Sequence, residues 1–190
     1  MKLCILIPTL IKRRESLKRL LTELDRQIKP FGRDVIYKIE EDNGEMSIGA
    51  KSNRLIQKAI DYNASHVCRF DDDDEPSPDY VKRVMQGVYQ DVDCCSLKGI
   101  ITENGQNPLI FEHSIKYHEY KTNPEGIEVR YERFPNHLNA IRLSIARQFP
   151  YPDISHGEDT DFAVQVYKSG LIKTEHYIPE VIYYYKWVTK

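Results

Sequence analysis

Apolar segments of two kinds alternate along the first half of the chain. Continuous apolar runs predict strands buried on both faces, and apolar residues spaced three and four positions apart predict helices with one buried stripe. The predicted strands are 3–7, 35–39 and 66–70, and a helix follows each of them, at about 17–28, 48–60 and 78–88. This order is typical of an α/β, Rossmann-like fold with a mostly parallel central sheet flanked by helices.

The second half follows a different pattern. Asn104-Gly105 is a dipeptide typical of tight hairpin turns, and residues 109–117 beyond it alternate between apolar and polar. We expect this segment to pair with 126–131 as a small antiparallel ribbon. The remaining predicted elements are strands at 92–97 and 99–102 and helices at 138–148 and 157–170. No repeat or linker interrupts 1–190, so one domain is expected.

Composition excludes several classes of protein. The chain has 190 residues, of which 41% are hydrophobic and 29% charged, and this is typical of a globular domain rather than a disordered one. A net charge of -2 excludes a strongly basic nucleic-acid binder. No apolar run approaches the roughly 18 residues of a transmembrane segment, and the four cysteines lack metal-ligand spacing. We therefore expect a cytoplasmic protein with no transmembrane segment and with buried free thiols.

Four consecutive aspartates, Asp71 to Asp74, end the third predicted strand. Two carboxylates about 6 Å apart repel by roughly 0.7 kcal/mol in water and by about 3 kcal/mol at an effective dielectric constant near 20. Oxygen ligands suit Mg²⁺ or Mn²⁺, either of which would relieve this repulsion. If the chain is extended there, Asp71 and Asp73 share one face and Asp72 points away. A solvated acidic loop is the alternative.

Polar residues also follow the first two predicted strands, at 8–9 and 41–43. Ligands of open α/β sheets bind outside the carboxyl ends of the strands, so these positions are candidates for a binding site. The chain has neither of the glycine-rich motifs that hold phosphates, and Lys51 or Arg54 would supply positive charge instead. A plain turn at 42–44 and an exposed helix surface at Lys51 and Arg54 are the alternatives.

The segment from His156 to Phe162 holds a fourth polar cluster at the start of the last predicted helix. Acidic residues are favoured in the first turn of a helix by its dipole, so capping is one explanation. Asp159, however, precedes Phe162 and Ala163 by three and four residues, which predicts that it lies on the buried stripe. A carboxylate aimed inward beside a metal site is a candidate general base.

Together these residues resemble the family 2 glycosyltransferases, which have the GT-A fold. The matching stretches are Ile5–Thr9, Gly49–Asn53, Phe70–Asp74, Pro78–Tyr80 and Gly157–Asp159, in the order of the family. The resemblance implies a nucleotide-binding half at about 1–98 and an acceptor-binding half at about 99–190. It also implies a nucleotide-sugar donor, often a UDP-sugar, with Mn²⁺ or Mg²⁺ on a DxD motif and inversion at the anomeric carbon.

The same resemblance assigns roles to individual residues. Asp159 would be the base that deprotonates an acceptor hydroxyl, and His156 and Glu158 would lie on the acceptor side. The donor side would consist of Pro8 and Thr9 at the nucleoside and Asp42 or Glu41 at the base, with Lys51 nearby. The DxD motif would be Asp71-Asp72-Asp73, in which Asp71 and Asp72 contact the donor, Asp71 near the ribose, and Asp71 and Asp73 hold the metal.

Other functions and partners remain open at this stage. A nucleotidyltransferase or phosphohydrolase using the same acids is one rival, and an inert nucleotide-sugar-binding module is another. The acceptor would be a saccharide, a lipid-linked sugar or a nucleic acid. The nucleic acid is included because 130–134 interleaves basic and aromatic residues, as segments that bind a nucleic-acid strand do. An edge strand is the alternative for that segment. His137, His156 and His176 are candidates for substrate or metal contacts, or are simply surface or core histidines.

Overall fold

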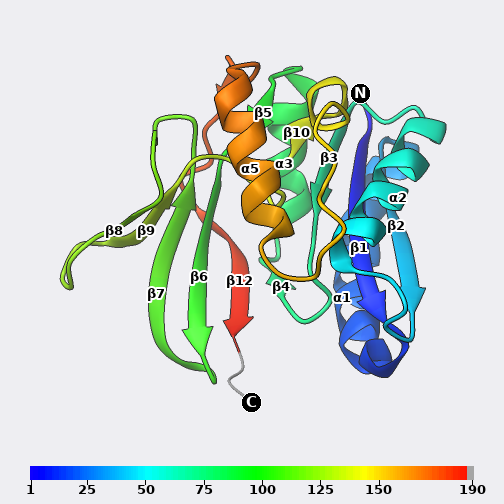
Figure 1. Cartoon of the computed structure of the whole chain (residues 1–190), viewed down its shortest axis with the longest axis horizontal. Helices are drawn as coiled ribbons and strands as arrows, with labels where there is room; N and C mark the ends of the chain where they lie inside the picture. The colour runs from blue at the N-terminus through cyan, green and yellow to red at the C-terminus, as the bar shows by residue number, and fades with distance from the viewer. Residues whose placement is uncertain (188–190) are drawn as a thin grey trace.

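The computed structural model describes residues 1–187, which form two six-stranded sheets with helices packed around the first (Figure 1). The first sheet has the order β11 (Glu175–His176), β5 (Cys94–Cys95), β10 (Ile141–Arg142), β3 (His66–Arg69), β1 (Leu3–Leu10) and β2 (Val35–Asp42). The second has the order β4 (Glu75–Pro76), β12 (Val181–Trp187), β6 (Leu97–Glu103), β7 (Gln106–His113), β9 (Val129–Arg133) and β8 (Lys121–Thr122). The α/β class is as predicted.

Strand β1 lies at the centre of the hydrophobic core. Its side chains alternate between the faces of the sheet, and each set joins a different cluster. Leu3, Ile5 and Ile7 pack with α1 (Arg14–Ile28) and α3 (Tyr80–Tyr89). Cys4 and Leu6 pack on the other face with α2 (Ile48–Asp61), α4 (Leu143–Ala146) and α5 (Glu158–Ser169). The continuous apolar run is explained because both faces are covered.

Strands β1, β2 and β3 run parallel and therefore end at one edge of the sheet. Thr9 pairs with Glu41 across β1 and β2, and Leu6 pairs with Arg69 across β1 and β3. Short 3-10 helices, Ile11–Arg13 and Lys29–Asp34, flank α1. The polar residues that follow the three strands therefore gather at this edge, as the sequence predicted.

The second sheet is larger than the predicted ribbon. Asn104 and Gly105 form the expected turn between β6 and β7, both with positive φ (51° and 75°). The strand predicted at 126–131 is observed as β9, which runs parallel to β7 and antiparallel to β8. The predicted antiparallel pairing of this segment with the long strand is therefore wrong.

The helix predicted at 138–148 is also wrong. Only α4 is helical there, and Ile141 instead lies in β10, between β3 and β5 of the central sheet. Ile141 is buried against Val67 and Cys94, so its long-range pairing overrides the helical spacing. The last helix is as predicted: α5 begins after Gly157 and ends at Ser169, with Gly170 as its C-terminal cap.

Within residues 1–187, no helix is both long and apolar enough to cross a lipid bilayer.

Gly49 fixes the approach of α2 to the segment that precedes α5. Its N–H donates to the carbonyl of Ile154 at 3.1 Å, and a Cβ at Gly49 would lie 1.8 Å from the carbonyl oxygen of Pro152. Alanine normally favours a helix over glycine by about 1 kcal/mol. Because backbone cannot retreat as a flexible side chain does, we expect Gly49→Ala to lower the free energy of unfolding by about 1–3 kcal/mol, measured by urea denaturation.

Gln57, on the exposed face of the same helix, provides the control. Gln57→Ala should change stability by less than about 0.5 kcal/mol. A Gly49→Ala protein as stable as the wild type would show that this approach is not tight.

Candidate active site

Residues Asp71 to Asp74 form a turn rather than an extended segment. The N–H of Asp74 donates to the carbonyl of Asp71 at 3.2 Å. The extended case, in which Asp71 and Asp73 would share one face, is therefore not the one observed. Asp71 and Asp74 instead line one cavity, while Asp72 and Asp73 contact Arg13.

Asp72 is tied to the end of β1. The Thr9 hydroxyl donates to its Oδ2 at 2.5 Å, and Arg13 donates to its Oδ1 at 2.8 Å. Arg13 also pairs with Asp73 at 3.1 Å. Burial, together with repulsion from Asp72 and Asp71, raises the pKa of Asp73 despite the Arg13 charge. One guanidinium thus serves two carboxylates and leaves this side of the turn short of positive charge.

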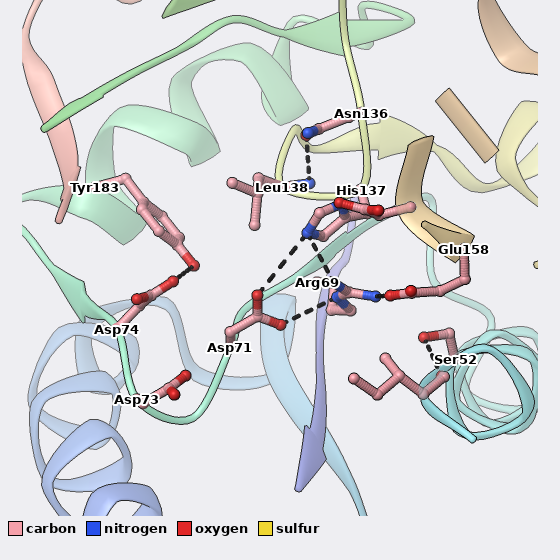
Figure 2. Close-up of polar contacts among 12 residues, drawn as sticks. Ser52, Arg69, Asp71, Asp73, Asp74, Asn136, His137, Leu138, Glu158 and Tyr183 are labelled. Atoms are coloured by element: carbon pink, nitrogen blue, oxygen red, sulfur yellow. Dashed lines mark hydrogen bonds and ion pairs between the residues drawn. The ribbon is translucent and has the colours of Figure 1, made fainter. Parts of the chain in front are cut away.

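Asp74 ties the turn to the second sheet. The buried Tyr183 hydroxyl on β12 donates to its Oδ2 at 2.6 Å (Figure 2). The Lys186 N–H donates to its Oδ1 at 3.0 Å. Burial and the nearby charge of Asp71 raise the pKa of Asp74 well above its usual value. These two hydrogen bonds hold the carboxyl group in place, but their donors are uncharged and supply no positive charge.

Arg69, the last residue of β3, is buried with three polar partners (Figure 2). Its NH1 lies 2.8 Å from Glu158 Oε1, its Nε 3.1 Å from Asp71 Oδ1 and its NH2 3.0 Å from His137 Nε2. Removing one partner of a buried ion pair leaves an uncompensated charge, which typically costs about 3–5 kcal/mol. Arg69 therefore joins the aspartate turn, the His137 loop and the start of α5.

The contact with Arg69 also sets the proton of His137. Burial, followed by the charge of Arg69, lowers the pKa of His137 well below its usual value, so the ring is neutral. Because Arg69 is only a donor, His137 Nε2 is the acceptor and the proton lies on Nδ1. Nδ1 has no hydrogen-bond partner within residues 1–187 and lies 3.6 Å from Asp159 Oδ2. The N–H therefore faces the candidate base.

In the first turn of α5, the acidic residue that is buried is not the one that the sequence predicted. Glu158, predicted on the acceptor side, is only 3% exposed and pairs with Arg69. The Asp159 side chain is 34% exposed and lines the cavity, so its predicted place on the buried stripe is wrong. Position 158 follows the left-handed Gly157 and turns inward instead. His156 is exposed, in the segment before the helix.

The cavity has a volume of about 230 Å³ and lies where the two sheets meet. Carboxylates from both halves of the sequence line it, together with a half-buried arginine, two histidines and aromatic rings. Its lining residues are Asp71, Asp74, Ile101, Phe111, His113, Tyr131, Arg133, Asn136, His137, Leu138, Asp159 and Tyr185. Hydrogen-bonding groups beside flat apolar surfaces suit a polar ligand with apolar faces, such as a sugar ring.

Lys51 links the ends of β1 and β2. It is buried, not exposed, and its Nζ donates to the Thr9 carbonyl at 2.6 Å and forms an ion pair with Asp42. Burial alone would raise the pKa of Asp42, but hydrogen bonds from Lys51 and from the backbone lower it. Arg54 is exposed and pairs with Glu40, and Glu41 pairs with Arg14. Asp42 and Lys51 are thus the preorganised pair at this edge, next to Pro8 and Thr9 in β1.

Within residues 1–187, no group of three or more histidine, cysteine or acidic side chains converges as a complete metal site. Mg²⁺ commonly takes one or two protein carboxylates together with substrate phosphates and water. The carboxylate oxygens of Asp71 and Asp73 are donors of the kind that such an ion prefers, and the pKa of Asp73 is raised by burial and by its aspartate neighbours. Asp71 and Asp73 would therefore be the residues to hold a divalent ion.

The fold is shared with solved structures of low sequence identity. A fragment of the S. aureus glycosyltransferase TarS, residues 1–349, is 15% identical, with a TM-score of 0.67 over 98% of this chain. The same fragment with UDP-GlcNAc gives a TM-score of 0.68. A197 from STIV is 12% identical, with a TM-score of 0.54 over 94% of this chain and 82% of its own. These likenesses establish the fold.

The chain spans 60% of the TarS fragment. No protein-family model matches this chain, and no curated protein sequence matches it either.

Four charged or titratable residues around the cavity were not assigned from the sequence. Arg69 left a signal, because a lone charge within the apolar run 66–70 requires a partner. Arg13 lies in the basic run 12–14, which by itself indicates no partner, and Arg133 lies in the segment 130–134, which was considered only as a nucleic-acid contact or an edge strand. His113 left none, since it occupies an ordinary alternating position of β7.

The Arg69–Glu158 pair yields a stability prediction. We expect Arg69→Met and Glu158→Met each to lower the free energy of unfolding by about 3–5 kcal/mol, because each leaves an unpaired buried charge. The double variant should cost less than the sum of the two by about 1–3 kcal/mol. Urea denaturation of the four proteins measures this cycle.

Arg142 and Asp91 provide a comparison pair on the surface, joined at 2.6 Å. Their coupling should be below about 1 kcal/mol. Equal coupling in both pairs would contradict the special role of Arg69.

Proposed function

We propose that this chain is a metal-dependent, inverting glycosyltransferase that moves a sugar from a UDP-sugar to an acceptor hydroxyl. The observation that carries the proposal is the position of Asp159, which faces Asp71 across His137 in a cavity at the carboxyl ends of the parallel strands. The TarS fold, solved with UDP and with UDP-GlcNAc, supports this choice of donor.

The donor would lie along the edge formed by β1, β2 and the aspartate turn. Asp42 and Lys51 are held in a fixed pair and would meet the base, next to Pro8 and Thr9. Asp71 and Asp72 would lie nearest the ribose, because Thr9 joins Asp72 to the end of β1. Such preorganisation lowers the cost of ordering a nucleotide.

The diphosphate would lie beside Asp71 and Asp73. A divalent ion held there supplies positive charge to the departing diphosphate. Arg13 now pairs with Asp73, so its guanidinium would move from the carboxylate to a phosphate oxygen when the donor binds.

Asp159 would accept the proton of the acceptor hydroxyl. The His137 N–H faces its Oδ2 and would hold this carboxylate in position. Glu158 contributes indirectly, because its pair with Arg69 anchors the first turn of α5. A hydroxyl activated from the face opposite the leaving group attacks in line, which inverts the anomeric carbon.

Donor binding is tested by thermal denaturation with UDP, GDP and CMP, each with and without Mn²⁺. We expect UDP with Mn²⁺ to stabilise the protein, by about 2.7 kcal/mol at a hundredfold excess over Kd. Asp71→Asn should remove the part of this stabilisation that depends on Mn²⁺. If none of the three nucleotides changes the melting temperature in the presence of Mn²⁺, the proposal is wrong.

The base is tested with Asp159→Asn. We expect kcat to fall by about a hundredfold or more, on the usual contribution of a general base, with the Kd for UDP and Mn²⁺ unchanged. Asp161, exposed in the same turn, is the matched control, and Asp161→Asn should keep full activity. Full transfer activity in Asp159→Asn would reject this assignment.

A further inference from the structure

Arg133 is the one cavity-lining arginine that no role above uses. It is the last residue of β9, and it lines the cavity together with Tyr131 of the same strand. It lies in the segment 130–134, whose alternation of basic and aromatic residues was noted in the sequence. Arg133 thus lies at the cavity wall, whereas Arg130 of the same segment does not.

The contacts of Arg133 hold the guanidinium without neutralising it. Its Cζ lies 4.8 Å from the ring centre of Tyr120 and 5.4 Å from that of Tyr131, and NH1 donates to the Lys121 carbonyl at 2.6 Å. Within residues 1–187 no carboxylate forms an ion pair with it. Burial lowers the pKa of Arg133, as expected for a cation short of negative partners. A stacked, half-buried guanidinium of this kind is suited to a planar or tetrahedral oxyanion.

His113 adds a buried nitrogen without a hydrogen-bond partner to the same wall. It is 5% exposed, and its Nδ1 has no hydrogen-bond partner within the described chain. Burial, followed by the charge of Arg133, lowers the pKa of His113 to about 4, so the ring is neutral near pH 7. A buried polar atom without a partner is costly unless a ligand or water meets it. His113 is the register partner of Arg133 on the neighbouring strand, so the unpartnered nitrogen and the unpaired cation lie on one wall of the cavity.

The carboxylates of the cavity belong to the aspartate turn and to α5, whereas Arg133 belongs to the second sheet. A neutral sugar would satisfy the carboxylates through its hydroxyl groups but would leave Arg133 desolvated and unpaired. A sugar that also carries a negative charge would satisfy both walls.

We propose that the cavity binds an acceptor saccharide that carries an anionic group, a phosphate or a carboxylate, held by Arg133 and His113. This inference rests on the proposed function, because it takes the cavity as the acceptor side of that site. A nucleic-acid strand is a poorer fit, since Arg130, the other arginine of β9, binds the Asn123 carbonyl and does not line the cavity.

Equilibrium binding tests the inference independently of turnover. Calorimetry would compare glucose, glucuronic acid and glucose 6-phosphate, with inorganic phosphate alone as a fourth probe. We expect at least one charged sugar to bind about tenfold more tightly than glucose, on the strength of charge-assisted hydrogen bonds. The two charged sugars distinguish a carboxylate from a phosphate ligand.

Two variants on β9 decide whether Arg133 is responsible. Arg133→Gln should abolish the preference for the charged sugar, and Arg130→Gln should retain it. Equal binding of all three sugars to the wild type, a preference that survives Arg133→Gln, or phosphate binding as tight as that of the sugar phosphate would each overturn the inference. The proposed function fails separately, by the absence of transfer or of UDP binding.

Discussion

The buried Arg69 guanidinium is the contact on which the candidate site depends. It lies where the end of β3, the loop carrying His137 and the first turn of α5 meet, and each of these supplies it with a partner. A buried cation requires all of its partners, because without one of them the free energy of its desolvation is no longer offset. Asp71 and Asp159 are thereby brought to opposite nitrogens of one imidazole.

A second constraint joins the two sheets beneath the cavity. Tyr183 of β12 is fully buried, and its ring lies 4.5 Å from that of Phe70 and 6.3 Å from that of Phe111. Its hydroxyl meanwhile holds Asp74. One side chain therefore connects the aspartate turn, the end of β3 and the second sheet. Because dense packing resists independent movement, the wall that carries Arg133 is positioned relative to the wall that carries the carboxylates.

Local patterns in the sequence predicted what depends on local interactions. The three parallel strands, the helices after them and α5 were readable because burial on one or two faces leaves a periodic trace. Ile141 was misassigned, since its spacing fits a helix and only the pairing with Val67 and Cys94 makes it a strand. The role of Arg69 was hidden for a related reason, because its partners His137 and Glu158 lie far away in the sequence.

The aspartate turn shows how such pairing changes a motif. In an extended chain, Asp71 and Asp73 would face a ligand together. Within residues 1–187, Asp72 and Asp73 of the observed turn share Arg13, Asp71 meets Arg69, and Asp74 has hydrogen bonds but no ion pair. Burial, together with the charges of neighbouring aspartates, raises the pKa values of Asp73 and Asp74. A cation added beside the turn would reduce this repulsion, and the divalent ion that we propose for the donor would be such a cation.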